Sequence, residues 1–362
     1  GAAIFIIDTT TEALVGNFAE IGQSSAAGDV SITAQDDTTL FTFPGAAGLG
    51  GSVGAGAAVG VGIITKTVSA KIGSDAKATG SDVLVEALSG EAVNVIAVSA
   101  GVGGSAGLAG AVAVYTIENN TTSSIGARAE VFAARNVAVL ANDFASVDSL
   151  VGSVGAGGSA GIGASVGIVI IDNKTYASVA DGAKVTALGA GTGVDYVSDF
   201  NVTFSALSDS FKGAGLPDWD ASGGLTASNA TANNADSKVG LTASDARDVG
   251  LSLLTKTRNS ETFTQTANGV VVNAAASNSI RSLEIGFGGG GSAAIALSGN
   301  VPVITADTRA TIGAAQINKM AGVADARQSI IVAATSDIYN MGIAGAAAIV
   351  GGVGAGAGVT VT

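Results

Sequence analysis

The stretch from residue 153 to residue 168 reads Ser-Val-Gly-Ala-Gly-Gly-Ser-Ala-Gly-Ile-Gly-Ala-Ser-Val-Gly-Ile. Every odd position in it is Gly or Ser, whereas the even positions include Val154, Ile162 and Val166. A period of two residues is typical of a β-strand, because successive side chains point to opposite faces. Gly is a poor strand residue unless another group packs closely against it. The stretch therefore predicts a strand whose small face lies against another backbone.

The pattern recurs along the chain, so the sequence is a tandem repeat. Its first marker, Gly-Gly followed by a small or apolar residue, starts at positions 50, 103, 157, 223, 290 and 351, at intervals of 53 to 67 residues. The second marker is an aliphatic segment that ends in Ala, such as residues 83–87 (VLVEA) and 137–141 (VAVLA). Between them lies a polar segment such as residues 171–175 (IDNKT), which we interpret as a turn. Three markers in constant order indicate about six repeats.

Each repeat combines a long small-faced strand, a polar turn, a short strand such as residues 183–187 and the aliphatic strand. Such a unit cannot bury its own apolar face, so the repeats must stack. We expect an all-β protein, a parallel β-solenoid (β-helix) of about six tandem repeats of 53–67 residues, with its handedness open. One wide coil per repeat is favoured over two or three narrow ones.

The repeats divide the chain into three expected regions. Regular β-solenoid repeats cover residues 1–206, and a degenerate repeat with surface-loop insertions covers residues 207–268. The β-solenoid repeats continue over residues 269–362, where the last repeat is truncated.

The composition excludes several function classes. The 362 residues include 54 Gly but no His and no Cys, and the net charge is −13. A thiol nucleophile, a His-based triad, an imidazole metal site and a disulfide framework are therefore ruled out. An acidic chain also lacks the basic field that nucleic acid or an anionic membrane requires. We expect no catalytic residue, no cofactor, no metal site and no nucleic-acid partner.

Some stretches without charge, such as residues 92–117 and 149–171, are long enough to cross a membrane as a helix. They are dominated by Gly, Ala and Ser, and they lack flanking aromatic residues and flanking Lys and Arg. Their period of two also argues for strands. The sequence therefore predicts no membrane span.

The order of residues 157–175, 183–187 and 202–206 resembles the repeats of very large bacterial surface adhesins. These are the filamentous-haemagglutinin and leukotoxin-like filamentous adhesins, and the resemblance covers most of residues 1–206 and 269–362. It implies an elongated β-solenoid stalk that is secreted to the bacterial cell surface and serves in adhesion or aggregation. It implies no catalytic residue, because the family's repeats have none to transfer.

The best candidate for a ligand-contact loop is Asp218-Trp219-Asp220, because an aromatic ring flanked by acids can bind a sugar. A tolerated surface loop is the simpler reading of the same residues. Carboxylates such as Asp172, Asp181, Asp195 and Asp199 could also form an acid/base pair or a Ca²⁺ site. Two alternatives stay open for this reason: a β-solenoid carbohydrate-active enzyme, or a glycan- or Ca²⁺-binding module that uses residues 211–268.

The leading hypothesis is a non-enzymatic, extracellular structural or adhesive segment of a repetitive surface adhesin or filament. An uncapped solenoid end is a template for further strands. We therefore expect self-association, end to end, into a fibre or a longer chain, with a host or neighbouring-cell surface or a glycan as the other partner.

Overall fold

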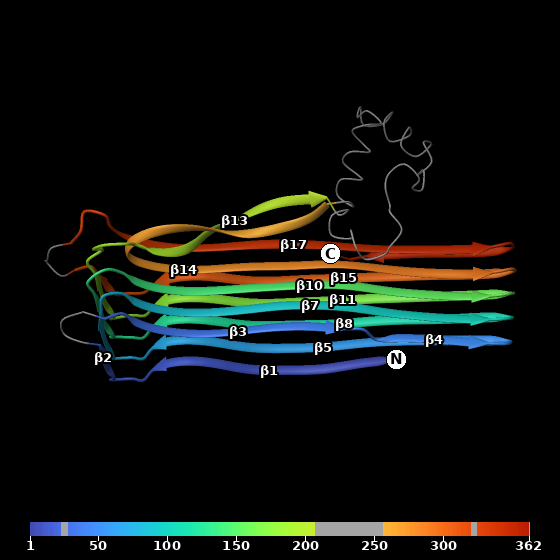
Figure 1. Ribbon diagram of the computed structural model, residues 1–362, viewed down its shortest axis with the longest axis horizontal. Helices are drawn as coiled ribbons and strands as arrows, with labels where there is room; N and C mark the ends of the chain where they lie inside the picture. The colour runs from blue at the N-terminus through green and yellow to red at the C-terminus, as the bar shows by residue number, and fades with distance from the viewer. Residues whose placement is uncertain (23–27, 207–255, 320–323, 362) are drawn as a thin grey trace, which may run out of the picture. The chain divides into compact units, whose positions relative to one another are not determined.

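Two long parallel sheets face each other in this protein, and a short third sheet bridges them along one side (Figure 1). The computed structural model describes residues 1–22, 28–206, 256–319 and 324–361. The chain forms two compact units, one of Gly1–Asp199 with Thr264–Thr362 and one of Phe200–Phe263. The stacked coils described below belong to the first unit.

The described residues form three sheets, named A, B and C. Sheet A contains β1 (Ala2–Val15), β5 (Val53–Ile72), β8 (Ala106–Ile125), β11 (Ala160–Val179), β15 (Ala293–Ile312) and β18 (Val353–Thr360). Sheet B contains β2 (Glu20–Gly22), β6 (Lys77–Gly80), β9 (Glu130–Ala133), β12 (Lys184–Ala187) and β16 (Gln316–Ile317). Sheet C contains β3 (Val30–Thr42), β4 (Gly45–Gly50), β7 (Val83–Gly103), β10 (Val137–Gly157), β13 (Val194–Ala206), β14 (Lys256–Gly290) and β17 (Gln328–Val350).

One strand from each sheet makes one coil, so β5, β6 and β7 form a coil and β8, β9 and β10 form the next. Equivalent residues of neighbouring coils pair in parallel without offset, as in the row Ile64, Ile117 and Ile171. A parallel β-solenoid with one wide coil per repeat is therefore confirmed.

The glycines on the small face lie where sheets A and C approach most closely. A Cβ added to Gly101 would lie 1.8 Å from the carbonyl oxygen of Leu108, and one added to Gly155 would lie 1.9 Å from that of Ile162. Neither position has room for any side chain. The prediction that another backbone packs against the small face is confirmed.

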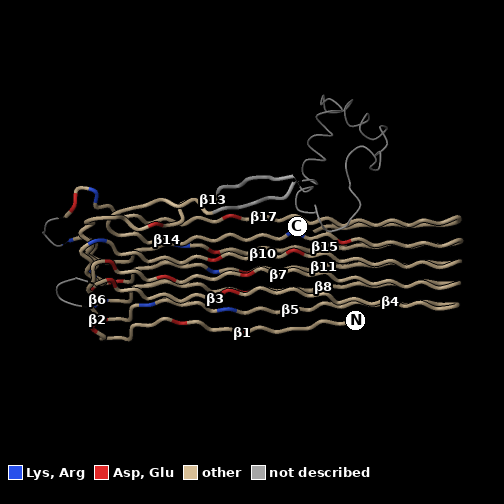
Figure 2. The backbone as a smooth tube through the Cα atoms, in the orientation of Figure 1, with Lys and Arg blue, Asp and Glu red and all other residues tan. Residues whose placement is uncertain are grey.

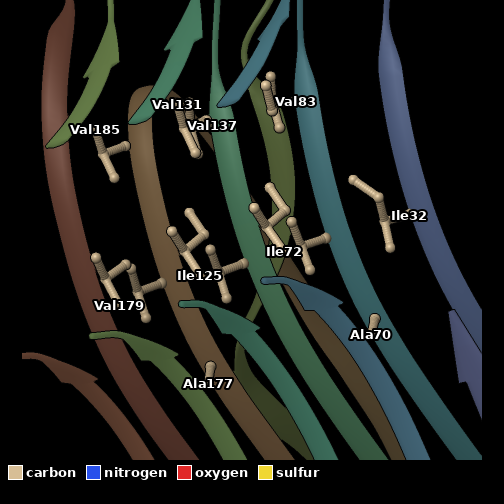
Figure 3. Packing of buried hydrophobic residues seen from close by; sticks show 14 of the residues in the cluster. Ile32, Ala70, Ile72, Val83, Ile125, Val131, Val137, Ala177, Val179 and Val185 are labelled. Atoms are coloured by element: carbon tan, nitrogen blue, oxygen red, sulfur yellow. The ribbon is translucent and has the colours of Figure 1, made fainter. Parts of the chain in front are cut away.

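Two apolar clusters fill most of the interior of the coils. The first lies between all three sheets and includes Ile72, Ile125 and Val179, which stack from coil to coil beside Val131 and Val185 (Figure 3). The second lies between sheets A and C alone and includes Ile64, Ile117 and Tyr115. Each cluster runs along the stacking direction, so a coil is stabilised mainly by its neighbours.

The polar segment was wrongly interpreted as a turn. Asp172, Asn173 and Lys174 lie in the middle of β11, and Glu118 and Asp8 lie at equivalent or nearby positions of β8 and β1. Asp172 and Lys174 face outward, whereas Asn173 faces the interior and is buried. The strand continues because the interior receives the polar side chains, as described below.

The actual turn between sheets A and B comes later in each coil. It places a residue with positive φ at the same position in successive coils: Phe18 at 61°, Asp75 at 58°, Arg128 at 57° and Gly182 at 74°. Only Gly adopts this left-handed conformation without a steric penalty. Phe18, Asp75 and Arg128 therefore adopt this left-handed conformation at a steric cost, because the turn requires it.

The predicted spacing also differs across residues 158–290. Gly157 pairs directly with Gly290, and Asp148 contacts Arg281, which is 133 residues further along the chain. This segment therefore forms one coil with a long insertion rather than two repeats. The marker at Gly223-Gly224, like residues 207–255 as a whole, lies outside the described residues.

Charges alternate in sign along sheet B. Glu20, Lys77, Glu130 and Lys184 occupy one row, and Gln316 follows them. Lys77 Nζ lies 2.8 Å from Glu20 Oε1, and Lys184 Nζ lies 2.7 Å from Glu130 Oε1. We call this row the charge ladder. Its ion pairs join the coils two by two, Lys77 with Glu20 and Lys184 with Glu130.

Candidate functional site

The predicted ligand-contact residues Asp218, Trp219 and Asp220 lie outside the described residues, so that prediction stays untested. Three of the other predicted acids, Asp172, Asp181 and Asp195, have separate partners. Asp181 accepts a hydrogen bond of 2.7 Å from the backbone amide of Ala314 in the next coil, and Asp195 accepts one of 2.5 Å from Thr266. Asp172 lies 3.7 Å from Lys174. The structure does not bring these acids together into an acid/base pair.

The main cluster of ionisable groups lies inside the solenoid, between the two apolar clusters. We call it the polar belt, and its members are buried or partly buried residues of sheets A and C: Asp36, Lys66, Ser89, Glu91, Asn119, Thr121, Asp143, Asn173 and Asn278.

Lys66 anchors one end of the polar belt. Its Nζ lies 2.7 Å from Asp36 Oδ1 and 2.7 Å from Glu91 Oε1, and it donates to the carbonyl oxygen of Asp36 at 3.0 Å. Ser89 donates a hydrogen bond of 2.7 Å to Glu91, and the Asn119 amide donates to the other Glu91 oxygen. One buried cation is thus shared by two carboxylates.

At the other end of the polar belt, Asp143 is the residue that accepts the most hydrogen bonds. It accepts hydrogen bonds of 2.7 Å from Thr121 Oγ1 and from Asn173 Nδ2, and a longer one of 3.4 Å from Asn119. Asn173 also contacts Asn278 in sheet C. The polar side chains of successive coils therefore form one continuous network along the stacking direction.

Burial sets the protonation of this network. It raises the pKa of Asp143 to about 7, with a further contribution from the nearby Glu91 carboxylate, although Thr121 and Asn119 oppose the change. Burial also raises the pKa of Glu91, against the effect of Lys66. Burial lowers the pKa of Lys66, but Glu91 and Asp36 outweigh it and the net direction is upward. Burial therefore raises the pKa of both acids and favours their neutral forms, while Lys66 opposes this for Glu91 and Asp143.

The side chains of Lys66 and Glu91 are fully shielded from solvent. They are closed off from solvent between the sheets, where their contacts join neighbouring coils. Sequence reasoning missed the polar belt. One pattern in the sequence could have indicated it. Val169, Ile171, Asn173 and Thr175 are spaced two residues apart, so in one continuous strand all four side chains face the interior, whereas a turn would have interrupted this alternation.

Glu284 is a second buried acid, nearer the narrow end of the coils. It is fully buried, and neither of its carboxylate oxygens has a hydrogen-bond partner. Burial raises its pKa to about 8, and the Asn300 amide, which is bonded to Ser282, lowers it only partly. Glu284 is therefore protonated in the folded protein at neutral pH.

The last coil leaves its interior open. The interior positions Val270 and Val272 of β14 are fully buried, whereas their row mates in β17, Ile330 and Val332, are 49% and 48% exposed. Ile338 in the same strand is 54% exposed. We call Ile330, Val332 and Ile338 the open end. An apolar surface of this kind can accept the inner face of another coil.

Within the described ranges, no group of three or more Asp or Glu side chains is placed to hold a metal ion. No helix among those residues is long and apolar enough to cross a membrane.

Comparisons with known proteins returned no relative: no family model, no curated protein and no solved structure matches the chain.

Proposed function

We propose that this protein is a non-enzymatic structural segment of a repetitive bacterial surface adhesin or filament, located outside the cell. The observation that carries the proposal is the open end, where Ile330, Val332 and Ile338 occupy interior rows that are buried in β7, β10 and β14. The coils are built on one register, so a further coil can add without any change in the backbone.

The chemistry of the described acids supports a structural role over an enzymatic one. The polar belt is enclosed between the sheets, and several acids at the surface form ion pairs, such as Asp75 with Arg128, 2.7 Å apart. The resemblance to filamentous adhesins supports the extracellular location, and the absence of Cys is compatible with it.

The test is to place charge on the open end. The double variant Ile330→Asp with Val332→Asp should prevent end-to-end association, because a buried unpaired carboxylate opposes the addition of another coil. Thr335→Asp, on the outward face of the same strand, is the matched control. Analytical ultracentrifugation and electron microscopy of the full chain measure the outcome.

The wild-type protein and the Thr335→Asp control should form rods with an axial strand spacing of about 4.8 Å. The double variant should form no rods and should keep an unchanged β-sheet circular dichroism spectrum. Rods of undiminished length in the double variant would refute association through the open end. Turnover of acidic polysaccharides by the purified chain would refute the non-enzymatic assignment.

A further inference from the structure

The outer face of sheet A divides into an apolar half and a polar half. Its outward-facing residues within 53–63, 106–116, 160–170 and 293–303 are Val, Ile, Leu, Ala and Gly, and Thr116 is the single polar one. We call these residues the apolar face. Figure 2 shows Lys, Arg, Asp and Glu of the described chain nearer the short strands and none at the opposite end of the coils, where the apolar face lies.

The apolar face is both exposed and large. Ile63, Leu108 and Leu297 on it are between 41% and 47% exposed. Over β5, β8, β11 and β15 it covers about 750 Å², from a rise of about 3.3 Å per residue and a strand spacing of about 4.8 Å. That area exceeds the largest apolar patch of a typical monomer, and it matches the roughly 800 Å² that each partner contributes to a standard protein–protein interface. Its size therefore indicates a protein partner.

A row of acids borders the apolar face. Asp8, Glu118 and Asp172 share the row that follows its last apolar row, on β1, β8 and β11. If a second copy met this face with its strands parallel, the two acid rows would lie opposite each other, and like charges oppose association. If its strands run antiparallel, the apolar faces overlap and each acid row lies beyond the uncharged Gly-Gly turns of the other copy. The charges therefore favour a copy with antiparallel strands.

The sizes of the side chains favour the same arrangement. A twofold axis parallel to the stacking direction, through the middle of the apolar face, places each strand against the same strand of the second copy, running the opposite way. At the centre of every strand a small residue then faces a larger one. The central pairs are Ala57 with Val59, Gly110 with Val112, Ala164 with Val166 and Gly299 with Leu297. Such pairs let two sheets interdigitate without voids.

A second copy with parallel strands would fit poorly. A twofold axis along the strands places β8 of one copy against β11 of the other, so that each row faces itself. Gly110 would then face Ala164, which leaves a void between the sheets. In the next row Leu108 would face Ile162, which places two large side chains together. The antiparallel arrangement avoids both faults, so size and charge favour the same axis.

From these observations we propose that the apolar face binds the apolar face of a second copy of this chain, through a twofold axis parallel to the stacking direction. The contact is isologous, because the same patch is used on both copies. The coils of both copies progress in the same direction along this axis. The pairing does not rest on the proposed function, since it uses the outside of sheet A and not the open end.

The outer face of sheet C is a poorer candidate for the same role. Its charge-free zone is shorter, because it begins only after Asp148 and Arg281. An open hollow of about 470 Å³ between Val102, Phe287 and Ile349 also interrupts it. A flat partner sheet would leave this hollow unfilled, so we assign the pairing to sheet A.

The first test measures lateral pairing alone, in the full chain with the open end blocked by Ile330→Asp and Val332→Asp. Sedimentation over a concentration series should show a monomer–dimer equilibrium. Adding Val166→Asp, which faces Ala164 of the second copy, should raise the dissociation constant of the dimer at least about tenfold, because it buries an unpaired carboxylate. Ser178→Asp, on the outward face of β11 in its polar half, is the matched control and should leave the equilibrium unchanged. Each variant is checked for an unchanged melting temperature.

The second test locates the twofold axis by disulfide formation, which is specific because the chain has no Cys of its own. In the same background, Ala160→Cys and Ile170→Cys lie opposite each other across the axis. Two copies of residue 160 lie about 33 Å apart along the strand direction, far beyond the reach of a disulfide. Oxidation of an equal mixture of the two variants should therefore give mixed dimers, whereas either variant alone should give few. Mass spectrometry under non-reducing conditions distinguishes these products.

Four results would overturn the pairing or its axis. A background variant that is monomeric at every concentration, or a dimer that Val166→Asp leaves intact, would remove the apolar face as the interface. Disulfides within each single population, but not in the mixture, would rule out the axis. Flotation with phosphatidylcholine vesicles that Val166→Asp abolishes would assign the face to lipid instead. A wild-type chain that forms these dimers but no rods would support the pairing and contradict the proposed function alone.

Discussion

Replacement of Glu284 by Gln is expected to remove a pH-dependent loss of stability. Glu284 is fully buried in β14, its carboxylate oxygens are unpaired, and its pKa is raised from 4.5 to about 8. Between these two values the folded protein keeps a proton that the unfolded chain has released. Stability therefore falls as pH rises through this window, and it is fully retained only below the unfolded pKa.

The magnitude follows from the width of the window. A separation of this size corresponds to about 5 kcal/mol lost between pH 4.5 and pH 8. Gln has nearly the shape of the protonated acid and never ionises. The variant should therefore match the wild type at pH 5 and exceed its unfolding free energy by about 4 to 5 kcal/mol at pH 9.

Urea unfolding of the full chain at pH 5, 7 and 9, followed by circular dichroism, measures this difference. Asp143, whose pKa is also raised, changes the slope of wild type and variant alike, so only their difference is used. Glu118→Gln, at an exposed position of β8, controls for the loss of a surface carboxylate and should change stability by less than about 1 kcal/mol. A wild-type-to-variant difference that is the same at pH 5 and pH 9 would refute the reasoning.

Three further substitutions are expected to change stability in stated directions. Gly167→Ala places a Cβ 2.0 Å from Glu284 Oε1 and should lower the unfolding free energy by about 1–3 kcal/mol. A second substitution, Glu284→Ala, should restore most of this loss, which a double-mutant cycle measured by urea unfolding would show. Lys66→Met leaves the buried Glu91 without its cation and should lower the unfolding free energy by about 3–5 kcal/mol in the same assay, with the largest loss at neutral pH. A loss under about 1 kcal/mol would contradict the arrangement in which two carboxylates share Lys66. Phe18→Gly relieves a positive φ of 61° at a side chain that is 75% exposed, so it should raise the unfolding free energy by roughly 0.5–1 kcal/mol in the same assay; a lowered unfolding free energy would show that the ring contributes packing.

The regular part of the fold could be predicted from the sequence because its cause is local. A face made of Gly and Ser, as in residues 153–168, admits few explanations other than a backbone packed against it, and Gly155 has that surrounding. The stacking of repeats followed from the same pattern, since a single coil leaves its aliphatic residues uncovered. Both inferences required only the order of residue sizes along one strand.

The polar belt could not be predicted in the same way, because its cause is not local. Asn173 within one repeat is a polar residue that interrupts an apolar strand, and a turn is the usual reason for such an interruption. Burial becomes acceptable only when Asp143 and Asn278, 30 and 105 residues away, supply partners. Knowledge of the register between coils has to come before these contacts can be recognised.

The repeat spacing predicted across residues 158–290 was wrong for a related reason. A Gly-Gly pair at position 223 matches the repeat marker by composition, but the row of Gly157 continues at Gly290. Composition alone does not distinguish a coil from an insertion that uses the same residues. The ligand-contact loop at Trp219 belongs to that region and stays a prediction.

The charge ladder of sheet B has a consequence for how such a chain can gain or lose repeats. Its signs alternate, from Glu20 to Lys77, Glu130 and Lys184. Deletion of one coil would bring two side chains of the same sign into contact, whereas deletion of two adjacent coils would restore the alternation. The charge ladder therefore repeats every two coils, and a change in length by pairs of coils keeps opposite signs next to each other along its charged part.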